Sequence, residues 1–390
     1  MNIKKIQEIK DEFKKIYNQD LKMTNNTLFE LHIKSYNDKN FELGKKVGCL
    51  IIENNLWKNV YQVQKNQLFY LENLSKLENS EIYTLTEPFL QLENPKPQFK
   101  DKKYNVLNPS IYKDIDNNIY VNIRHVSFIG HNYESMTIDH KIRTRNTFGL
   151  LENNKLSSNY YELKDRGYYT KLRNSVLGFE DLKLFEFNNQ KYFTCTSYET
   201  SKTTDVLLGK IDEPKNNICE VTNVFPLHGD MVVDHKAEKN WMPILDSSEK
   251  LKLVYSIFPL HIVSVDEEQK KVFTYYKKDW NINLGFWRGS SCLVPYKNGF
   301  LFVIHEVYFP DYPKTVRHYV HRIGLLSNDY ETLQFSDPFF IERKNPIQYC
   351  NGLVFKDSKI YISYGDDDKE AKLLIMNEVH LEHLLTNKTQ

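Results

Sequence analysis

Residues 288–305 read Arg-Gly-Ser-Ser-Cys-Leu-Val-Pro-Tyr-Lys-Asn-Gly-Phe-Leu-Phe-Val-Ile-His. They consist of a polar segment, an apolar strand, a tight turn at Lys297-Asn-Gly299 and a second apolar strand. Asn and Gly favour such turns because both adopt positive φ at little steric cost. The stretch therefore predicts a β-hairpin that begins with a polar segment.

The same arrangement occurs five times after residue 107, at intervals of roughly 50–70 residues. The other four copies begin with the polar segments Asn108-Pro-Ser-Ile, Glu180-Asp-Leu-Lys, Glu238-Lys-Asn-Trp-Met-Pro and Cys350-Asn-Gly. A regularly repeated supersecondary unit is typical of a propeller, a solenoid or an array. Five sheets packed around an axis would bring the five polar segments together at one end of that axis. We therefore predict a mainly β chain, with a five-bladed β-propeller over residues 104–385.

Further strands are predicted between the paired ones, as outer strands of the blades, and a short helix near the end of the chain. The predicted strands are Asp205–Ile211, His261–Val265, Val272–Tyr276, His321–Leu326 and Lys372–Met376, and the predicted helix is Val379–Leu385.

The first 95 residues show a different pattern. Ile6, Ile9, Phe13 and Ile16 recur at helical spacing, which predicts an amphipathic helix. Further helices are predicted from Phe41 to Ile52 and from Val60 to Leu74, in the manner of a degenerate helical repeat. We expect residues 1–95 to form an α-helical cap, with the two prolines of 93–97 marking a linker.

Composition excludes several classes of function. The 390 residues carry a net charge of +1, so no overall field attracts nucleic acid. The five cysteines form no CxxC pair, and the histidines show no metal-binding spacing, so we expect no disulfide framework and no metal. No apolar run has the length of a membrane span, and the first residues do not resemble a signal peptide. We therefore expect a cytoplasmic protein.

The adjacent carboxylates Glu180 and Asp181 are the first candidates for chemistry. Side chains alternate along a strand, so the two are expected to point to opposite faces. One would then face the axis while the other braces a loop. Glycosyl transfer requires a carboxyl group that delivers a proton to a leaving oxygen. The alternative interpretation is that both only bind backbone N–H groups in a turn.

The segment Glu238-Lys239-Asn240-Trp241 is the second candidate. It combines an acceptor, a cation, an amide and an aromatic face, a set that suits a sugar or a phosphate group. Arginine is much rarer than lysine in this chain, so Arg124 and Arg288 are further candidates for a guanidinium clamp.

Taken together, the polar segments resemble a known family. Asn108-Pro109, Gly178-Phe-Glu-Asp181, Glu238-Lys-Asn-Trp-Met-Pro243, Arg288-Gly-Ser290, Val303-Ile-His-Glu306 and Ser363-Tyr-Gly-Asp366 follow one another in an order similar to that of glycoside hydrolase family 130, the five-bladed β-mannoside phosphorylases. The related glycosyltransferase family 108 is also similar, and the resemblance is closest to a bacterial branch with the Glu-Lys-Asn-Trp motif. It covers roughly residues 105–385.

The resemblance implies an enzyme that transfers a glycosyl, expected mannosyl, unit. Asp181 would be the acid, acting through a sugar hydroxyl, with Glu180 bracing it. Inorganic phosphate or a sugar phosphate would be the co-substrate, with no other cofactor, and the partner would be an oligosaccharide or a glycoconjugate. Where the family has Glu-Asp-Pro-Arg, this chain has Leu182 and Lys183 at the last two positions. The expected binding residues are Asn108, Arg124, Lys183, Lys239, Asn240, Trp241, Arg288, His305, Tyr364 and Asp366.

Two alternatives remain open at this stage. An inverting hydrolase would need a second carboxylate that activates water, for which Glu238 and Asp366 are candidates. A propeller that only binds sugars would need no catalytic group, since a fold does not by itself establish an enzyme. The sequence also leaves open a homo-oligomer, the identity of the sugar and the choice between phosphorolysis and transfer.

Overall fold

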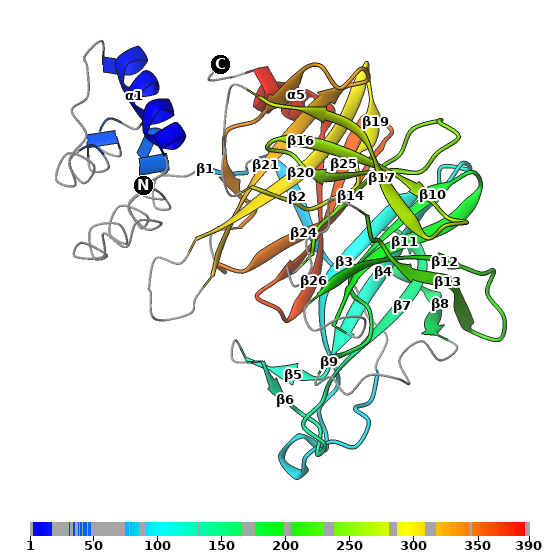
Figure 1. Cartoon of the computed structure of the whole chain (residues 1–390). Coiled ribbons are helices and arrows are strands. Elements are labelled where there is room, and N and C mark those ends of the chain that lie inside the picture. Colours follow the sequence, from blue (N-terminus) through cyan, green and yellow to red (C-terminus); the bar gives the residue numbers. More distant parts are fainter. Residues whose placement is uncertain are drawn as a thin grey trace. The chain divides into compact units, whose positions relative to one another are not determined.

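The fold was analysed in a computed structural model of the chain (Figure 1). The structure describes residues 3–17, positions 31, 34–35, 38, 40, 42–44 and 46–47, and residues 75–77, 79–85, 90–130, 133–165, 176–198, 204–229, 238–280, 287–308, 317–342 and 345–386. The chain divides into two compact units. The first comprises residues 1–75, 282–286 and 307–318, and the second comprises the remainder.

The first unit contains helix α1 (Ile3–Tyr17). Ile9 and Phe13 are buried, as their helical spacing predicts, whereas Ile16 is 40% exposed. Positions 42–44 and 46–47 are helical, within the predicted helix Phe41–Ile52. The helix predicted from Val60 to Leu74 lies outside the described residues.

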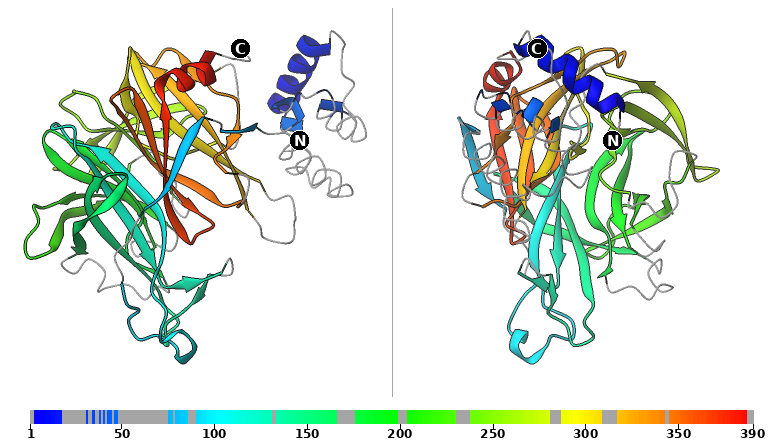
Figure 2. Two further views of the ribbon diagram at one scale, coloured as in Figure 1. Left: turned by 180° about the vertical axis from the view of Figure 1, so that it is seen from behind. Right: turned by 60° about the vertical axis from the view of Figure 1, so that its left-hand side comes forward.

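The prediction of a helical region up to residue 95 is wrong for its last part. β2 (Ser80–Thr84) is a strand that pairs antiparallel with β26 (Glu370–Asn377), so that Ile82 lies opposite Leu374. Figure 2 shows β2, in light blue, beside the orange and red strands at the end of the chain. Backbone groups at a sheet edge need hydrogen-bond partners, and this edge obtains them from β2. A helix in this segment would leave the edge unpaired.

The second unit is built almost entirely of strands. The largest sheet has the order β10 (Glu180–Phe187), β11 (Gln190–Ser197), β12 (Asp205–Ile211), β13 (Ile218–Pro226), β8 (Lys155–Asp165), β7 (Ile142–Glu152), β4 (Ile119–Val126), β3 (Asn105–Lys113), with β9 (Val176–Leu177) beside β7. Neighbours along this order are antiparallel except β13 and β8, which are parallel. The sheet therefore consists of two four-stranded antiparallel groups that join at their outer strands.

Three further groups follow along the chain. One sheet has the order β14 (Met242–Ile244), β15 (Lys252–Ser256), β16 (Leu260–Asp266), β17 (Lys271–Lys278). The next contains β1 (Ser75–Lys76), β23 (Phe339–Phe340), β21 (His318–Ser327), β20 (Gly299–Tyr308) and β18 (Arg288–Gly289), with β19 (Val294–Tyr296) on β20 and β22 (Leu333–Phe335) on β21. The last has the order β2, β26, β25 (Lys359–Asp366), β24 (Gln348–Lys356). Smaller elements are β5 (Phe128–Ile129) with β6 (Glu134–Ser135), η2 (Pro97–Phe99) and α5 (Glu378–Thr386).

The predicted strand pairs are confirmed. β3 pairs with β4, β10 with β11, β14 with β15, β19 with β20, and β24 with β25, all antiparallel. Turn residues Asn117, Asn188, Lys297 and Asp357 have positive φ, which explains the polar turns between the strands. The further strands and the terminal helix also form, as β12, β16, β17, β21, β26 and α5. The chain is therefore mainly β, as predicted.

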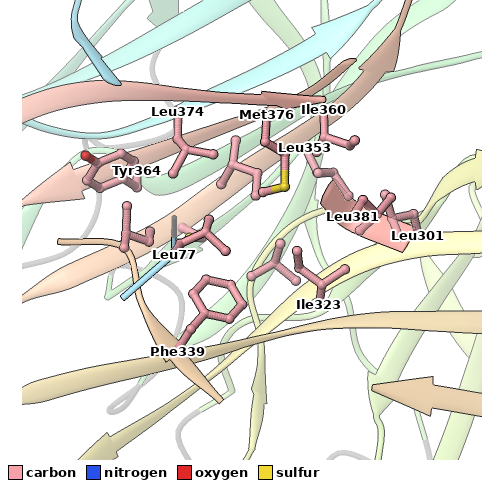
Figure 3. Close-up of a cluster of buried hydrophobic side chains, with 14 of the residues drawn as sticks. Leu77, Leu301, Ile323, Phe339, Leu353, Ile360, Tyr364, Leu374, Met376 and Leu381 are labelled. Atoms are coloured by element: carbon pink, nitrogen blue, oxygen red, sulfur yellow. The ribbon is translucent and has the colours of Figure 1, made fainter. Parts of the chain in front are cut away.

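Hydrophobic clusters lie between the strand groups. One contains Leu301 and Ile323 from β20 and β21 together with Leu353, Ile362 and Leu374 from the last sheet (Figure 3). Such contacts join sheets that are not paired with each other as strand ladders, because each strand buries one face against the next group.

The first strands of separate groups also approach one another closely. A Cβ atom on Gly352 of β24 would lie 2.4 Å from the Ile111 nitrogen of β3. Only glycine allows two backbones to approach this far. The polar segments at the starts of β3 and β24 therefore lie side by side.

Two absences concern the described part of the chain. No helix in it is long and apolar enough to cross a membrane. Its four cysteines, Cys195, Cys219, Cys292 and Cys350, are buried and free, so none of them forms a disulfide.

Candidate functional site

Two β-bulges shape the centre of the candidate site. The ladder between β3 and β4 shifts register between Leu107 and Ser110, and the ladder between β10 and β11 shifts between Glu180 and Lys183. A bulge turns the side chain of its extra residue away from the ordinary alternation. At these two bulges the chain contains residues that tolerate positive φ: Asn108 at 45° and Asp181 at 48°. Asn108 Nδ2 donates a hydrogen bond of 2.7 Å to Asp181 Oδ1.

The expectation that Glu180 and Asp181 point to opposite faces is wrong. Arg124 Nη1 donates to Asp181 Oδ1 at 2.7 Å, and Arg124 Nη2 donates to Glu180 Oε1 at 2.8 Å. Alternation fails here because the bulge adds a residue between the two ladder positions. The guanidinium fork is thereby shared by two carboxylates, an arrangement that the single charge of lysine would not reproduce.

Arg124, Glu180 and Asp181 form a triad in which burial and charge act against each other. Arg124 is 4% exposed, whereas the Glu180 and Asp181 side chains retain 13% and 17% exposure. Burial alone would raise the pKa of Asp181, but the Arg124 charge and the Asn108 amide outweigh it and hold that pKa below its ordinary value. Burial opposes the Arg124 charge as well, yet Glu180 and Asp181 raise the pKa of Arg124. Asp181 and Arg124 are therefore both ionised in the resting site.

Lys239 extends the site on the other side of Glu180. Its Nζ lies 3.8 Å from Glu180 Oε2 and donates a 3.1 Å hydrogen bond to the Tyr198 hydroxyl. Burial opposes the ammonium charge, but Glu180 raises the pKa of Lys239. Glu180 therefore contacts two cations, Arg124 at Oε1 and Lys239 at Oε2.

A second chain of hydrogen bonds lies beside the triad. Lys183 Nζ donates to the Tyr349 hydroxyl at 3.1 Å, and that hydroxyl donates to Asn240 Oδ1 at 3.0 Å. The edge of the His305 ring contacts the Tyr349 ring at a centroid distance of 5.2 Å. Ser290 Oγ lies 2.8 Å from His305 Nδ1, and burial lowers the pKa of His305. Three predicted side chains, Lys183, Asn240 and His305, thus meet at Tyr349, which sequence reasoning missed.

Asn351 and Gly365 hold the backbone that positions Asn108 and Asp181. Asn351 Nδ2 donates to the carbonyl oxygens of Asn108 and Leu182, at 3.3 and 3.1 Å. It thereby ties β24 to the two bulges that position Asn108 and Asp181. Gly365 of β25 packs against the same place, since a Cβ there would lie 2.1 Å from Asn108 Oδ1 and 2.6 Å from Asn108 N.

Replacing Gly365 by Ala is therefore expected to displace Asn108 and weaken its bond to Asp181. The added methyl meets backbone, which cannot move aside as the end of a flexible side chain can. We expect a loss of stability of about 1–3 kcal/mol in urea unfolding. Gly130→Asn is the control, because its surroundings are open and asparagine tolerates its φ of 66°. Wild-type stability in Gly365→Ala would contradict this close contact.

Trp241 and Glu238 do not face the triad. The Trp241 side chain is 1% exposed within a hydrophobic cluster, and its Nε1 donates to Glu238 Oε2 at 3.2 Å. The Tyr255 hydroxyl donates to Glu238 Oε1 at 3.2 Å. The Trp241 ring is therefore packed inside this cluster and is not available for stacking on a sugar.

Tyr364 and Asp366 belong to a separate buried cluster. The Tyr364 ring packs among the hydrophobic side chains of the last sheet (Figure 3), and its hydroxyl donates to Glu342 Oε1 at 2.6 Å. Lys372 pairs with both Glu342 and Asp366, at 2.9 and 2.5 Å. The structure therefore does not join these two predicted residues to the triad by any hydrogen bond in the described ranges.

Arg288 is exposed, in contrast to Arg124. In the ladder between β18 and β20, Arg288 lies opposite His305, whose ring contacts Tyr349. No three His, Cys, Asp or Glu side chains gather at metal-binding distance within the described ranges.

The architecture of the second unit is propeller-like, and solved structures share it. No family model matches the chain, and no curated protein is significantly similar in sequence. A β-1,2-mannobiose phosphorylase from Listeria innocua, solved with β-1,2-mannobiose, superposes with a TM-score of 0.52 at 12% identity, over 79% of this chain and 100% of that one. At this identity the similarity shows the fold.

Two further structures are similar at lower scores. One belongs to the GH130 family of mannoside phosphorylases, described as containing glycoside hydrolases that target β-1,2-mannosidic linkages in Candida mannan. It has a TM-score of 0.49 at 12% identity, over 78% of this chain and 97% of that one. A mannose phosphorylase from Leishmania mexicana, solved with a phosphate ion, has a TM-score of 0.44 at 11% identity over 76% and 91%.

Proposed function

We propose that the protein is a carbohydrate-active enzyme that transfers a glycosyl, in particular a mannosyl, unit, and that its five strand groups act as five propeller blades. The observation that carries the proposal is the pair of partly exposed carboxylates, Glu180 and Asp181, on one buried guanidinium. It occurs on an architecture shared with a β-1,2-mannobiose phosphorylase. Asn108, Arg124, Lys239 and Asn240 would bind the substrate and the co-substrate.

The proposed reaction is phosphorolysis or its reverse. A phosphate oxygen attacks the anomeric carbon, the bond from that carbon to the leaving oxygen breaks, and the leaving oxygen takes up a proton. Asp181 delivers this proton through a sugar hydroxyl, which passes its own proton on and is reprotonated by the carboxyl group. No metal is needed, because the nucleophile is already anionic and the leaving group is protonated.

The ionised state of Asp181 places a condition on this mechanism. A carboxylate cannot deliver a proton until its pKa rises, and Arg124 holds that pKa down. A phosphate bound near Arg124 and Lys239 would offset their charge and raise the pKa of Asp181. We therefore expect Asp181 to take up its proton when the anionic co-substrate binds.

Hydrolysis is the second candidate, and the positions of its candidate bases disfavour it. Glu238 accepts hydrogen bonds from Trp241 and Tyr255 in the interior of its sheet. Asp366 is 1% exposed and paired with Lys372. A base must contact the attacking water, and neither side chain has a comparable exposure to that of Asp181.

The test is a synthesis assay with purified protein and manno-oligosaccharide acceptors. One tube contains mannose 1-phosphate and the other GDP-mannose, since a transferase would use the sugar nucleotide. Phosphate release from the first tube is the expected result, and GDP release would establish transfer instead. A parallel degradation assay with and without phosphate detects hydrolysis. If no assay shows turnover and oligosaccharide binding is measurable, the protein would be assigned as a sugar-binding protein and not as an enzyme.

A further inference from the structure

Lys183 is a buried cation with one hydrogen-bond partner. Its side chain is 3% exposed, and among the described residues its ammonium bonds only the Tyr349 hydroxyl, at 3.1 Å. No carboxylate in those ranges lies within 4.0 Å of its Nζ. Burial lowers the pKa of Lys183, and the charge of Asp181 opposes that shift. A buried ammonium is normally compensated by a carboxylate or by several acceptors. The Tyr349 hydroxyl is uncharged and cannot compensate the Lys183 charge, so its hydrogen bonds must be considered for what they orient.

The ammonium fixes the direction of the hydrogen-bond chain. In its charged form it can only donate, and in the structure Nζ donates to the Tyr349 oxygen. The phenolic hydrogen is then available for Asn240, which accepts it at Oδ1 at 3.0 Å. The amide orientation of Asn240 follows: Oδ1 faces Tyr349, and the Nδ2 hydrogens point away from it.

The backbone of Asn240 is fixed as well. Its φ is 64°, in the left-handed region, and a Cβ on Gly289 would lie 2.2 Å from its carbonyl oxygen. The side chain is half-buried, and Nδ2 has no hydrogen-bond partner among the described residues. A donor that is fixed in place and left unpaired is suited to a ligand oxygen.

We propose that Tyr349 is a positioning residue that holds the Asn240 amide with Nδ2 toward the ligand, and that the ligand atom it receives is an oxyanion oxygen. An oxyanion suits the position because the hydrogen bonds from Lys183 to Tyr349 and from Tyr349 to Asn240 run in the same direction, so each polarises the next toward the Asn240 amide hydrogens. Lys239, the neighbour of Asn240 in the sequence, adds a second positive charge. The inference rests on the proposed function only in taking inorganic phosphate as the oxyanion.

The test uses three variants of the full chain: Tyr349→Phe, Asn240→Asp and the double variant. Tyr349→Phe removes only the hydroxyl, since the ring is kept in place by His305 and Tyr319, at centroid distances of 5.2 and 6.3 Å. Asn240→Asp keeps the shape of the side chain but replaces the donor by an acceptor. The affinity for inorganic phosphate is measured by isothermal titration calorimetry, and kcat and KM for phosphate are measured separately.

Tyr349→Phe is expected to weaken phosphate binding about tenfold, and Asn240→Asp by at least as much. The double variant should bind no worse than Asn240→Asp alone, because Tyr349 then has no amide to orient. The loss should appear in KM for phosphate more than in kcat. Tyr296→Phe is the matched control: it removes the hydroxyl of a tyrosine that is 3% exposed and bonded to Glu378, outside the hydrogen-bond chain from Lys183 to Asn240, and should leave the affinity unchanged.

The outcomes separate this inference from the proposed function. Loss of phosphate affinity in the variants, with no turnover in the wild type, would support the inference and reject the enzyme. Turnover with unchanged phosphate affinity in Tyr349→Phe, or fully additive losses in the double variant, would reject the inference alone. Absence of phosphate binding in the wild type would also overturn it.

Discussion

Asp181→Asn is expected to fold normally and to lose turnover by a factor of about 10²–10⁴, the usual contribution of a positioned acid. Asparagine has the shape of aspartate, and its Oδ1 still accepts hydrogen bonds from Asn108 and Arg124. It cannot exchange a proton with a sugar hydroxyl, so the leaving oxygen would depart unprotonated. The initial rate of phosphate release from mannose 1-phosphate measures the loss.

The control for this variant is Asp139→Asn, which removes a carboxylate from an arginine pair at the surface. The Asp139 side chain is 36% exposed, so neither folding nor turnover should change much. Circular dichroism and thermal unfolding would establish that both variants are folded. Turnover at the wild-type level in Asp181→Asn would reject the assignment of Asp181 as the acid.

Arg124→Met should have the largest effect on stability. It leaves the Glu180 and Asp181 carboxylates without their shared guanidinium, and breaking a buried ion pair from one side costs about 3–5 kcal/mol. Urea unfolding at neutral pH measures the change. Arg143→Met is the matched control, because the Arg143–Asp139 pair, with side chains 20% and 36% exposed, is more accessible than the Arg124 pairs and is expected to contribute about 1 kcal/mol or less.

The destabilisation by Arg124→Met should depend on pH with a definite sign. In the wild type the pKa of Asp181 is lower in the folded than in the unfolded protein, so this carboxylate stabilises the fold above its unfolded pKa. That contribution is lost as the pH falls through the folded pKa. In Arg124→Met the pKa of Asp181 should rise, so the difference in stability between the two proteins should shrink as the solution is acidified. A difference that grows toward low pH would contradict this.

The strand pairs were predictable because their signals are local. Each hairpin has its apolar runs and its turn residues within about twenty positions, as in residues 288–305. The gathering of polar segments was predictable only through the repeat, and Asn108, Arg124, Glu180 and Asp181 do meet.

Other features depend on tertiary contacts that no local pattern carries. The bulge that turns Glu180 and Asp181 toward the same guanidinium breaks the alternation on which the sequence argument relied. Tyr349 has no signal except its position directly before the fifth polar segment, since one tyrosine among many attracts no notice. Trp241 looked like a ligand platform because aromatic residues serve both binding and packing, and its burial decides for packing.

The strand β2 gives the second unit an unusual assembly order. It is hydrogen-bonded along its length to β26, with Ser80 opposite Met376, so a segment made early is completed by one made about 300 residues later. Contacts of such sequence separation are slow to form, because a long loop must close first. During synthesis β2 therefore stays without its partner strand until β26, about 300 residues later, has emerged from the ribosome. The same pairing joins the first and last parts of the strand-rich unit by hydrogen bonds, so that local unfolding of either part must break the last sheet.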